Sequence, residues 1–285
     1  MIKYRLLAIV FLLNSLLLAA QDKPAYQIFD KNGKKVKYEK MLKGAAKAEV
    51  LFFGEFHDNP IIHWLQFEAT RDLAKSNRLV LGAEMFEADN QSQLNDYLSG
   101  KINQKALDTV ARLWNNYKTD YKPLVDLAKE NKLSFIATNV PRKYASLVYK
   151  NGFGALDVLT DEEKRWMAPL PIAYDPNLPG YVKMLEMMGG HGGDNLPKAQ
   201  AIKDATMSYF ISKNLQPNTL FIHYNGSYHS DNYDGINWYL KKTNPNLNIV
   251  TIASVSQKEV LELEKENVGK ADFIIVVDED MTKTF

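Results

Sequence analysis

The stretch Val50-Leu51-Phe52-Phe53-Gly54-Glu55-Phe56-His57-Asp58-Asn59-Pro60 joins a short apolar run to a polar segment. Four consecutive apolar residues, 50–53, are typical of a strand that is covered on both faces, as in a parallel sheet. Asn59 and Pro60 are residue types that begin helices, as the N-cap and the first helical residue. A buried strand followed by a helix predicts an α/β fold, and three ionisable residues lie between the two elements.

The same alternation continues along the chain. Further short apolar runs predict strands at 79–81, 133–137, 219–222, 248–253 and 271–277. Helical patterns are predicted at 60–76, 91–99, 105–113, 121–131, 141–150, 197–214, 235–242 and 257–266. The expected fold is therefore α/β, with a mostly parallel sheet flanked by helices.

Two segments depart from this alternation. Residues 157–194 contain four prolines and several glycines, which favour an insertion of helices and loops that forms a lid. Residues 184–193 combine methionines with glycines around His191, which indicates a mobile apolar flap; an ordinary helix end with a glycine C-cap is the alternative. Residues 22–47 contain an Asn-Gly pair between candidate strands, which predicts a hairpin.

The first twenty residues resemble a secretory signal peptide. Two basic residues precede the apolar run 6–18, and Ala19-Ala20 offers a cleavage site before Gln21. An uncleaved anchor is the alternative, but the run is short for a membrane span and no other segment is long and apolar enough. We expect a signal peptide at 1–20, a single domain at 21–285, and export to the periplasm or beyond the cell.

Composition narrows the function classes. The 285 residues include 35 Lys and Arg, 34 Asp and Glu, and no cysteine. Without Lys3 and Arg5 the balance is 33 positive to 34 negative, so the charge gives no indication of a nucleic-acid or acidic-lipid partner. The lack of cysteine excludes a disulfide, a thiolate metal site, a catalytic thiol and an N-terminal lipid anchor.

Polar side chains follow four of the predicted strands. They are Glu55, His57 and Asp58; Glu84 and Glu87; Asn139 and Arg142; and Tyr228 and His229. The carboxyl ends of parallel strands share one edge of a sheet, where α/β proteins bind ligands. We therefore expect a polar pocket there.

Each group also has a structural interpretation. Glu55 or Asp58 would serve as a helix cap, and Glu84 would form a salt bridge with Arg142. His63 lies inside the following helix, so we assign it a structural role. Gln200 and Asp204 share one helix face, which either points into the pocket or is solvated.

Several motifs occur in the order found in a known family. They are GEFHDNP, AEMFEADNQSQLNDYLSG, the pair Trp114 and Tyr117, ATNVPRKYA, His191, PKAQAIKDATMSYFI and NGSYHSDNYDGINWYL. Over residues 49–240 the chain resembles the ChaN-like haem-binding uptake family of the Tiki superfamily. That superfamily also includes erythromycin-esterase-like hydrolases and Tiki-type metalloproteases.

The resemblance implies haem binding and iron uptake, with haem held through a tyrosine and shared between two protomers of a homodimer. Tyrosinate and imidazole both serve as ligands of haem iron. The candidates for the haem pocket are Tyr117, Arg142, His191 and Tyr228. Tyr174 and Tyr181 are further tyrosines near these motifs. Members of the family are often lipoproteins, and this chain departs from them because it has no cysteine.

The resemblance to hydrolases of the superfamily gives a second hypothesis. Glu55, His57, Glu84 and His229 would bind a divalent metal such as zinc, which activates a water molecule. Without a metal, His57 or Glu84 would act as the base, and Arg142 or His229 would stabilise an oxyanion. A third reading is an envelope protein that does not use the pocket. The length of the family resemblance favours haem or iron binding.

Overall fold

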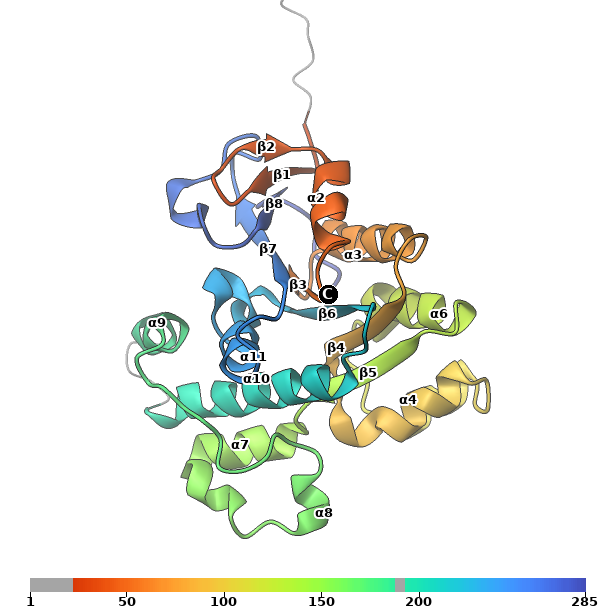
Figure 1. Ribbon diagram of the computed structural model, residues 1–285, viewed down its shortest axis with the longest axis vertical. Helices are drawn as coiled ribbons and strands as arrows, with labels where there is room; N and C mark the ends of the chain where they lie inside the picture. The colour runs from red at the N-terminus through yellow and green to blue at the C-terminus, as the bar shows by residue number, and fades with distance from the viewer. Residues whose placement is uncertain (1–22, 188–192) are drawn as a thin grey trace, which may run out of the picture.

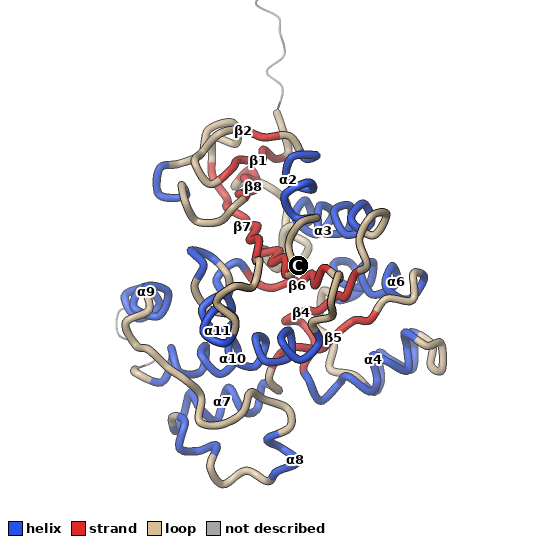
Figure 2. Tube along the Cα trace, viewed as in Figure 1, coloured by secondary structure: helices blue, strands red, loops and turns tan. Residues whose placement is uncertain are grey.

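The computed structural model describes residues 23–187 and 193–285. Eight strands form one sheet (Figures 1 and 2). They are β1 (Tyr26–Asp30), β2 (Lys35–Val36), β3 (Val50–Glu55), β4 (Leu79–Glu87), β5 (Ser134–Asn139), β6 (Leu220–Gly226), β7 (Ile249–Gln257) and β8 (Phe273–Asp278). Their order across the sheet is β2-β1-β8-β7-β3-β6-β4-β5.

The six strands from β8 to β5 run parallel, which confirms the expected fold class. β1 is antiparallel to β8 and to β2, so the predicted N-terminal hairpin adds an edge to the sheet. Gly33 in its turn has a φ of 78°, a backbone conformation that glycine adopts without steric cost. Because β3 lies between β7 and β6, its end is at the centre of the sheet edge.

Helices cover both faces of the sheet (Figure 1). They are α2 (Tyr38–Ala45), α3 (Pro60–Leu73), α4 (Gln91–Leu98), α5 (Gln104–Val110), α6 (Lys122–Glu130), α7 (Arg142–Asn151), α8 (Asp161–Lys164), α9 (Pro179–Met187), α10 (Asn195–Asn214) and α11 (Ile236–Thr243). One apolar cluster joins α2, α3, α4, α5 and α6 to one face, and another joins α10 and α11 to the other. None of the helices described is both long enough and apolar enough to cross a bilayer.

The alternation of apolar residues explains these two layers. Leu51 and Phe53 of β3 face the first cluster, whereas Val50 and Phe52 face the second. Successive strand side chains point to opposite faces, so a continuous apolar run is what a doubly covered strand needs. At the end of β3, Asn59 accepts hydrogen bonds from the backbone N–H groups of Ile61 and Ile62, which begins α3 as predicted.

Two parts of the fold differ from the sequence predictions. The helix predicted at 257–266 is wrong, because β7 continues to Gln257 and a loop follows. The buried Gln257 amide donates to the carbonyls of Glu259 and Glu262, which satisfies backbone groups that a helix would pair internally. Helix α2 was not predicted, because its residues were assigned to the hairpin.

Residues 157–187 and 193–194 form the expected insertion of short helices and loops. It contains α8 and α9, and α9 lies against α10. The segment around His191, predicted as a flap, lies outside the described residues. The insertion therefore borders the same side of the sheet as α10 and α11.

Candidate functional site

Glu55, the last residue of β3, is buried and holds three hydrogen-bonding partners. Its Oε1 accepts from the Tyr121 hydroxyl at 2.7 Å and lies 2.8 Å from His57 Nδ1. Its Oε2 accepts from Gln66 Nε2 at 2.6 Å. Glu55 therefore does not cap α3, a role that Asn59 fills. It is a carboxylate fixed from three sides that orients an imidazole.

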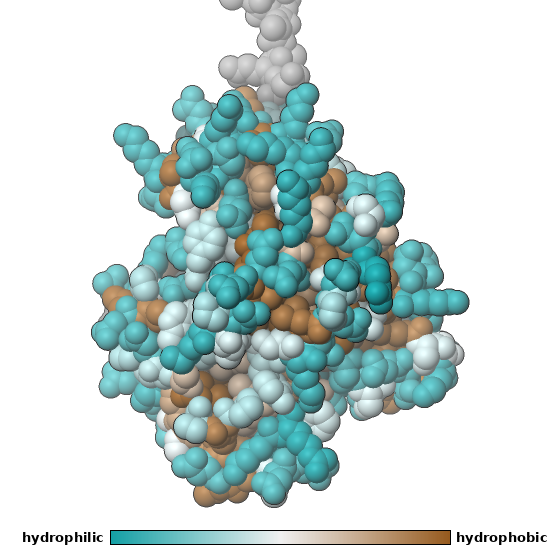
Figure 3. Space-filling view, in the orientation of Figure 1, coloured by the Kyte–Doolittle hydropathy of each residue, from teal (hydrophilic) through white to brown (hydrophobic). Residues whose placement is uncertain are grey.

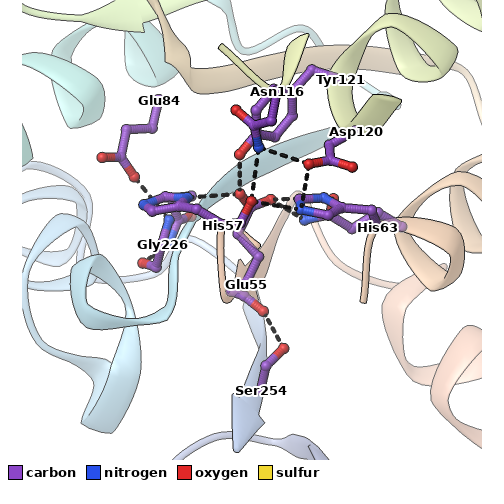
Figure 4. A network of polar contacts seen from close by, with 12 residues as sticks. Glu55, His57, His63, Glu84, Asn116, Asp120, Tyr121, Gly226 and Ser254 are labelled. Atoms are coloured by element: carbon purple, nitrogen blue, oxygen red, sulfur yellow. Dashed lines mark hydrogen bonds and ion pairs between the residues drawn. The ribbon is translucent and has the colours of Figure 1, made fainter. Parts of the chain in front are cut away.

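The contact with Glu55 determines how His57 presents its ring (Figure 4). Since Nδ1 faces the carboxylate, Nε2 points away from it, over Gly226. A Cβ atom at Gly226 would lie only 2.9 Å from this Nε2. The side chain is 35 % exposed, and its ring meets Trp114 edge to face at 4.9 Å. Burial lowers the pKa of His57, but the bond to Glu55 and the charge of Glu84 outweigh it and raise the pKa.

Besides the pair Glu55 and His57, a second pair of an acid and a histidine joins β4 to the loop after β6. It consists of Glu84 and His229. Glu84 Oε2 accepts from the Gly226 N–H at 2.8 Å, and Oε1 lies 3.1 Å from His229 Nε2. The other ring nitrogen of His229 lies 2.5 Å from Asp204 Oδ1 on α10. All three side chains are buried. His229 is thus held between two carboxylates.

Charge explains the titration of this second pair. Burial alone would lower the pKa of His229, but Glu84 and Asp204 together raise it to about 10. Burial alone would raise the pKa of Glu84, but His229, His57 and the Gly226 N–H hold it well below its usual range. At neutral pH the pair is therefore an imidazolium and a carboxylate. The charge of Glu84 favours the protonated form of His57, and the charge of His229 acts in the opposite direction.

The insertion contacts this arrangement through α9. Tyr181 donates its hydroxyl to Asp204 Oδ2 at 3.2 Å, and the Tyr228 hydroxyl donates to the carbonyl of Gly180 at 2.6 Å. The Gly180 N–H donates to Asp234 Oδ2 at 2.8 Å. These bonds place α9 beside the site, where a lid was expected.

A pocket of about 570 Å³ opens in front of His57. We call it the sheet-edge pocket. Its wall includes Phe56, Tyr228 and Phe285 as aromatic residues and Lys270 as a cation. Five acidic residues also line it: Glu55, Asp58, Asp231, Glu264 and Glu266. The pocket is therefore strongly acidic.

Asp231 is the most unusual of these acids. Its Oδ1 is buried and has no hydrogen-bond partner among the described residues. Its Oδ2 lies 4.0 Å from Lys270 Nζ. Burial raises the pKa of Asp231 to about 7, although Lys270 and Lys183 act in the opposite direction. This carboxyl group titrates near neutral pH at the wall of the pocket.

The structure brings together four of the predicted site residues: Glu55, His57, Glu84 and His229. Arg142 is not among them, because its side chain is exposed at the start of α7 and its backbone N–H donates to Glu87 Oε1. The predicted salt bridge between Glu84 and Arg142 is wrong, since Glu84 pairs with His229 instead.

The residues predicted to form a haem pocket differ in how exposed they are and in whether they line the sheet-edge pocket. Tyr117 is buried in the core, where its ring packs edge to face on Phe86, so it is not accessible to a haem iron. Tyr228 lines the sheet-edge pocket and is 40 % exposed. His191 lies outside the described residues. Among the predicted haem-binding residues that the structure describes, Tyr228 lines the pocket, whereas Tyr117 and Arg142 do not.

The four residues predicted as metal ligands do not form one ligand set. Within 23–187 and 193–285 no group of three or more His, Cys, Asp or Glu side chains could hold a metal ion. Both ring nitrogens of His229 face carboxylates, and Nδ1 of His57 faces Glu55. Neither ring nitrogen of His229 nor Nδ1 of His57 is therefore available to a metal, which leaves Nε2 of His57 as the available imidazole nitrogen of these two residues.

A layer behind His57 was not predicted from the sequence. Asn116 donates to the carbonyl of His57 at 2.8 Å and to Asp120 at 2.7 Å. His63 lies 3.1 Å from the same carbonyl, which agrees with the structural role assigned to it (Figure 4). One of the residues behind the site could have been found from the sequence. Gln66 is a polar residue on the apolar face of α3, which indicates a buried hydrogen bond.

The geometry can be compared with known proteins. A sequence model described as haem-binding uptake, Tiki superfamily, ChaN matches residues 41–240. The solved structure titled cofacial heme binding to ChaN of Campylobacter jejuni is similar in fold, with a TM-score of 0.67 and 18 % identity over 90 % of this chain and 98 % of that one. A mutant of the erythromycin esterase EreC has a TM-score of 0.52 and 10 % identity, over 92 % of this chain and 99 % of that one.

One curated protein is also similar. It is Protein RETICULATA-RELATED 5, chloroplastic, of Arabidopsis thaliana, which is 27 % identical over 144 residues. The match takes in 48 % of this chain and 19 % of that protein. The chain thus spans about a fifth of this relative.

Proposed function

Since this chain belongs to the haem-binding uptake ChaN family of the Tiki superfamily, we propose that it binds haem, with His57 Nε2 as the ligand of the iron. One observation supports this position above the others. His57 is the described histidine whose Nδ1 is bonded to a carboxylate while Nε2 faces a pocket. Iron-binding imidazoles characteristically make that second bond, which fixes the ring and raises its basicity.

The sheet-edge pocket fits haem in two respects, its volume and its aromatic wall residues. Its volume of about 570 Å³ lies within the common range of small-molecule sites, about 300–1,000 Å³. Phe56, Tyr228 and Phe285 offer aromatic surface. When bound, haem would supply an iron that His57 could ligate.

The acidic residues restrict how haem would lie. Carboxylates of haem are repelled by Asp231, Glu264 and Glu266, so they would extend toward Lys270 or into solvent. Burial raises the pKa of Tyr228, and the charges of Asp204, Asp234 and Asp231 act in the same direction. Tyrosinate is therefore disfavoured there, and the imidazole of His57 is the better donor.

A ferric-haem titration followed by Soret absorbance tests this proposal. The wild type should give a saturable shift of defined stoichiometry, and His57→Ala should weaken it by about a hundredfold or more, the effect of removing a ligand. Tyr228→Phe keeps the ring and should bind as the wild type does. Unchanged binding by His57→Ala, with loss in Tyr228→Phe, would assign the ligand to the tyrosine.

Hydrolysis is the second candidate function, and the same pair of residues favours it. When Nδ1–H of His57 donates to Glu55, a lone pair is left on Nε2, as in hydrolases whose base is oriented by a carboxylate. His57 would take a proton from water as the water oxygen attacks an ester carbonyl, and would return it to the alcohol oxygen as the acyl C–O bond breaks. Glu84 would hold charge rather than act as the base, because both its oxygens are bonded.

A panel of ester substrates tests this second function with purified protein. We expect turnover that rises with pH through the raised pKa of His57 and is lost in His57→Ala. A Glu55→Gln variant should shift that pH profile downward, because it removes the charge that raises the pKa. Turnover that persists in His57→Ala would exclude His57 as the base.

Export, iron uptake and dimerisation belong to the same proposal. Residues 1–20 have the order of a signal peptide, so we propose a mature periplasmic or secreted protein that begins at Gln21. N-terminal sequencing of the protein recovered from each cell fraction tests this. Sedimentation with and without haem tests a homodimer, which haem should favour if two chains share it.

A further inference from the structure

A second cavity lies between the insertion and two helices, and we call it the insertion groove. It has a volume of about 460 Å³, and its wall comes from residues 168–173, α10 and α11. Ala205, Ser208 and Ser212 line it from α10. These positions are three and four residues apart and share a helix face, so small side chains leave the space open. No residue of its wall also lines the sheet-edge pocket.

The inner part of the groove is apolar. Ala168, Ile172, Ala205 and Tyr239 are each at most 8 % exposed and belong to one hydrophobic cluster. The hydroxyl of Tyr239 donates to the carbonyl of Ala173 at 2.6 Å, so its polar end is already satisfied. Figure 3 shows hydrophobic residues at the surface near α7, a helix that contributes to the same cluster. A ligand that enters the groove therefore meets hydrocarbon.

The outer part of the insertion groove carries positive charge. Lys242 is the charged residue of the wall, and none of the described wall residues is acidic. The side chain is exposed and its Nζ lies 5.0 Å from the centre of the Trp238 ring. Ser208 and Ser212 add hydroxyl groups on the α10 side. An apolar channel with one cation at its edge matches an amphiphile with an anionic head.

We propose that the insertion groove binds a carboxylate carried on an alkyl chain, such as a fatty acid. The chain would lie against Ala168, Ile172 and Ala205, and the carboxylate would face Lys242. The wall contains no imidazole, and the Tyr239 phenol is committed, so an acyl chain matches it better than a porphyrin iron does. This site is independent of haem binding at His57.

Calorimetric titration of the full chain with dodecanoate tests this proposal. We expect saturable binding that Ser212→Trp weakens by about tenfold or more, because an indole at this exposed position fills the groove. Lys242→Ala should weaken it by about threefold, the usual size of one exposed charge contact. Lys150→Ala, an exposed lysine at the end of α7, should change nothing. Uncharged dodecanol should bind the wild type and Lys242→Ala equally.

Three results would overturn the proposal. They are no saturable binding of dodecanoate, binding that Ser212→Trp leaves unchanged while the variant melts as the wild type does, and dodecanoate binding that haem displaces competitively. His57→Ala separates the two sites. It should lose haem and keep dodecanoate, whereas haem binding that survives in His57→Ala and is lost in Ser212→Trp would move haem into the groove.

Discussion

The sheet-edge pocket and the insertion groove have similar volumes and opposite chemistry. The pocket, of about 570 Å³, is lined by five acids and one lysine, whereas the groove, of about 460 Å³, has one lysine and an apolar floor. The pocket arises because parallel strands deliver polar residues to one edge, and the groove arises because small residues of α10 face a proline-rich loop. The volume of a cavity therefore does not indicate its ligand, whereas the charge and polarity of the wall residues do.

The two regions also differ in how they are built. Behind the pocket, the side chains of Glu84, Asp204 and His229 are buried, and His229 lies between the two carboxyl groups. Around the groove the clustered side chains are apolar, and the hydroxyl of Tyr239 donates to the carbonyl of Ala173. Substitutions behind the pocket should therefore cost stability, and substitutions at the mouth of the groove should not.

The largest expected effect comes from Glu84→Ala. It leaves the buried His229 with one carboxylate and the Gly226 N–H without its acceptor. Removing one partner of a buried ion pair costs about 3–5 kcal/mol. Urea unfolding should show that loss, while Glu162→Ala, at an exposed position, should stay within about 0.5 kcal/mol of the wild type. A loss for Glu84→Ala as small as that of Glu162→Ala would mean that the pair contributes nothing to stability.

The next effect is the dependence of stability on pH. The pKa of His229 is raised to about 10, above its value of about 6.5 in the unfolded chain. Its contribution is therefore complete below about pH 6.5 and is lost as the pH rises toward about 10. The free energy of unfolding should fall over this range in the wild type. In Asp204→Asn, which removes one of the two carboxylates that raise the pKa of His229, the fall should still begin at about pH 6.5 but should end at a lower pH and be smaller.

A smaller effect is expected from Gly226→Ala, which affects the front of the pocket. The new methyl group would lie 2.9 Å from His57 Nε2, so the ring must move. We expect a loss of about 1–3 kcal/mol in stability from overpacking, and haem affinity that falls by about tenfold. Gly154→Ala is the matched control, because nothing lies within 4 Å of its Cβ position. Wild-type haem affinity in Gly226→Ala would argue that Nε2 does not face the ligand.

The smallest effect concerns Asp231, whose pKa is raised to about 7. The unfolded chain ionises this group near pH 4, so the folded protein is penalised increasingly from about pH 4 to pH 7. Asp231→Asn should therefore stabilise the protein at about pH 8 by on the order of 1 kcal/mol, and the gain should vanish near pH 4. Denaturant unfolding at both pH values measures it. A destabilised Asp231→Asn would show that the ionised carboxylate has a partner in solution.

The residues that follow the strands could be placed at one sheet edge from the sequence, because that placement requires only that the strands are parallel. Glu55, His57 and Glu84 lie at the edge that the alternation indicated. Arg142 and Tyr117 were misplaced because exposure depends on how a helix is rotated against its neighbours, which short motifs do not encode. The insertion groove could not be predicted from a sequence pattern, because it depends on the packing of α10 against a loop distant in sequence.

The same limit applies to residues 257–266. Their pattern of apolar and acidic residues is helical, but the buried amide of Gln257 pairs with two loop carbonyls instead. Tyr121 and Gln66 likewise gain their role only when α3 and α6 meet the end of β3. Contacts between elements, rather than local pattern, decide these positions.

His57 Nε2 is the atom that we propose as the ligand of haem iron at the sheet-edge pocket. Pulsed electron paramagnetic resonance of the ferric complex, with the protein labelled with ¹⁵N-histidine, tests this proposal directly. We predict a ¹⁵N hyperfine coupling to the iron in the wild type and its loss in His57→Ala, with Tyr228→Phe unchanged. A haem complex without any histidine coupling, or with the same coupling in His57→Ala, would contradict the claim.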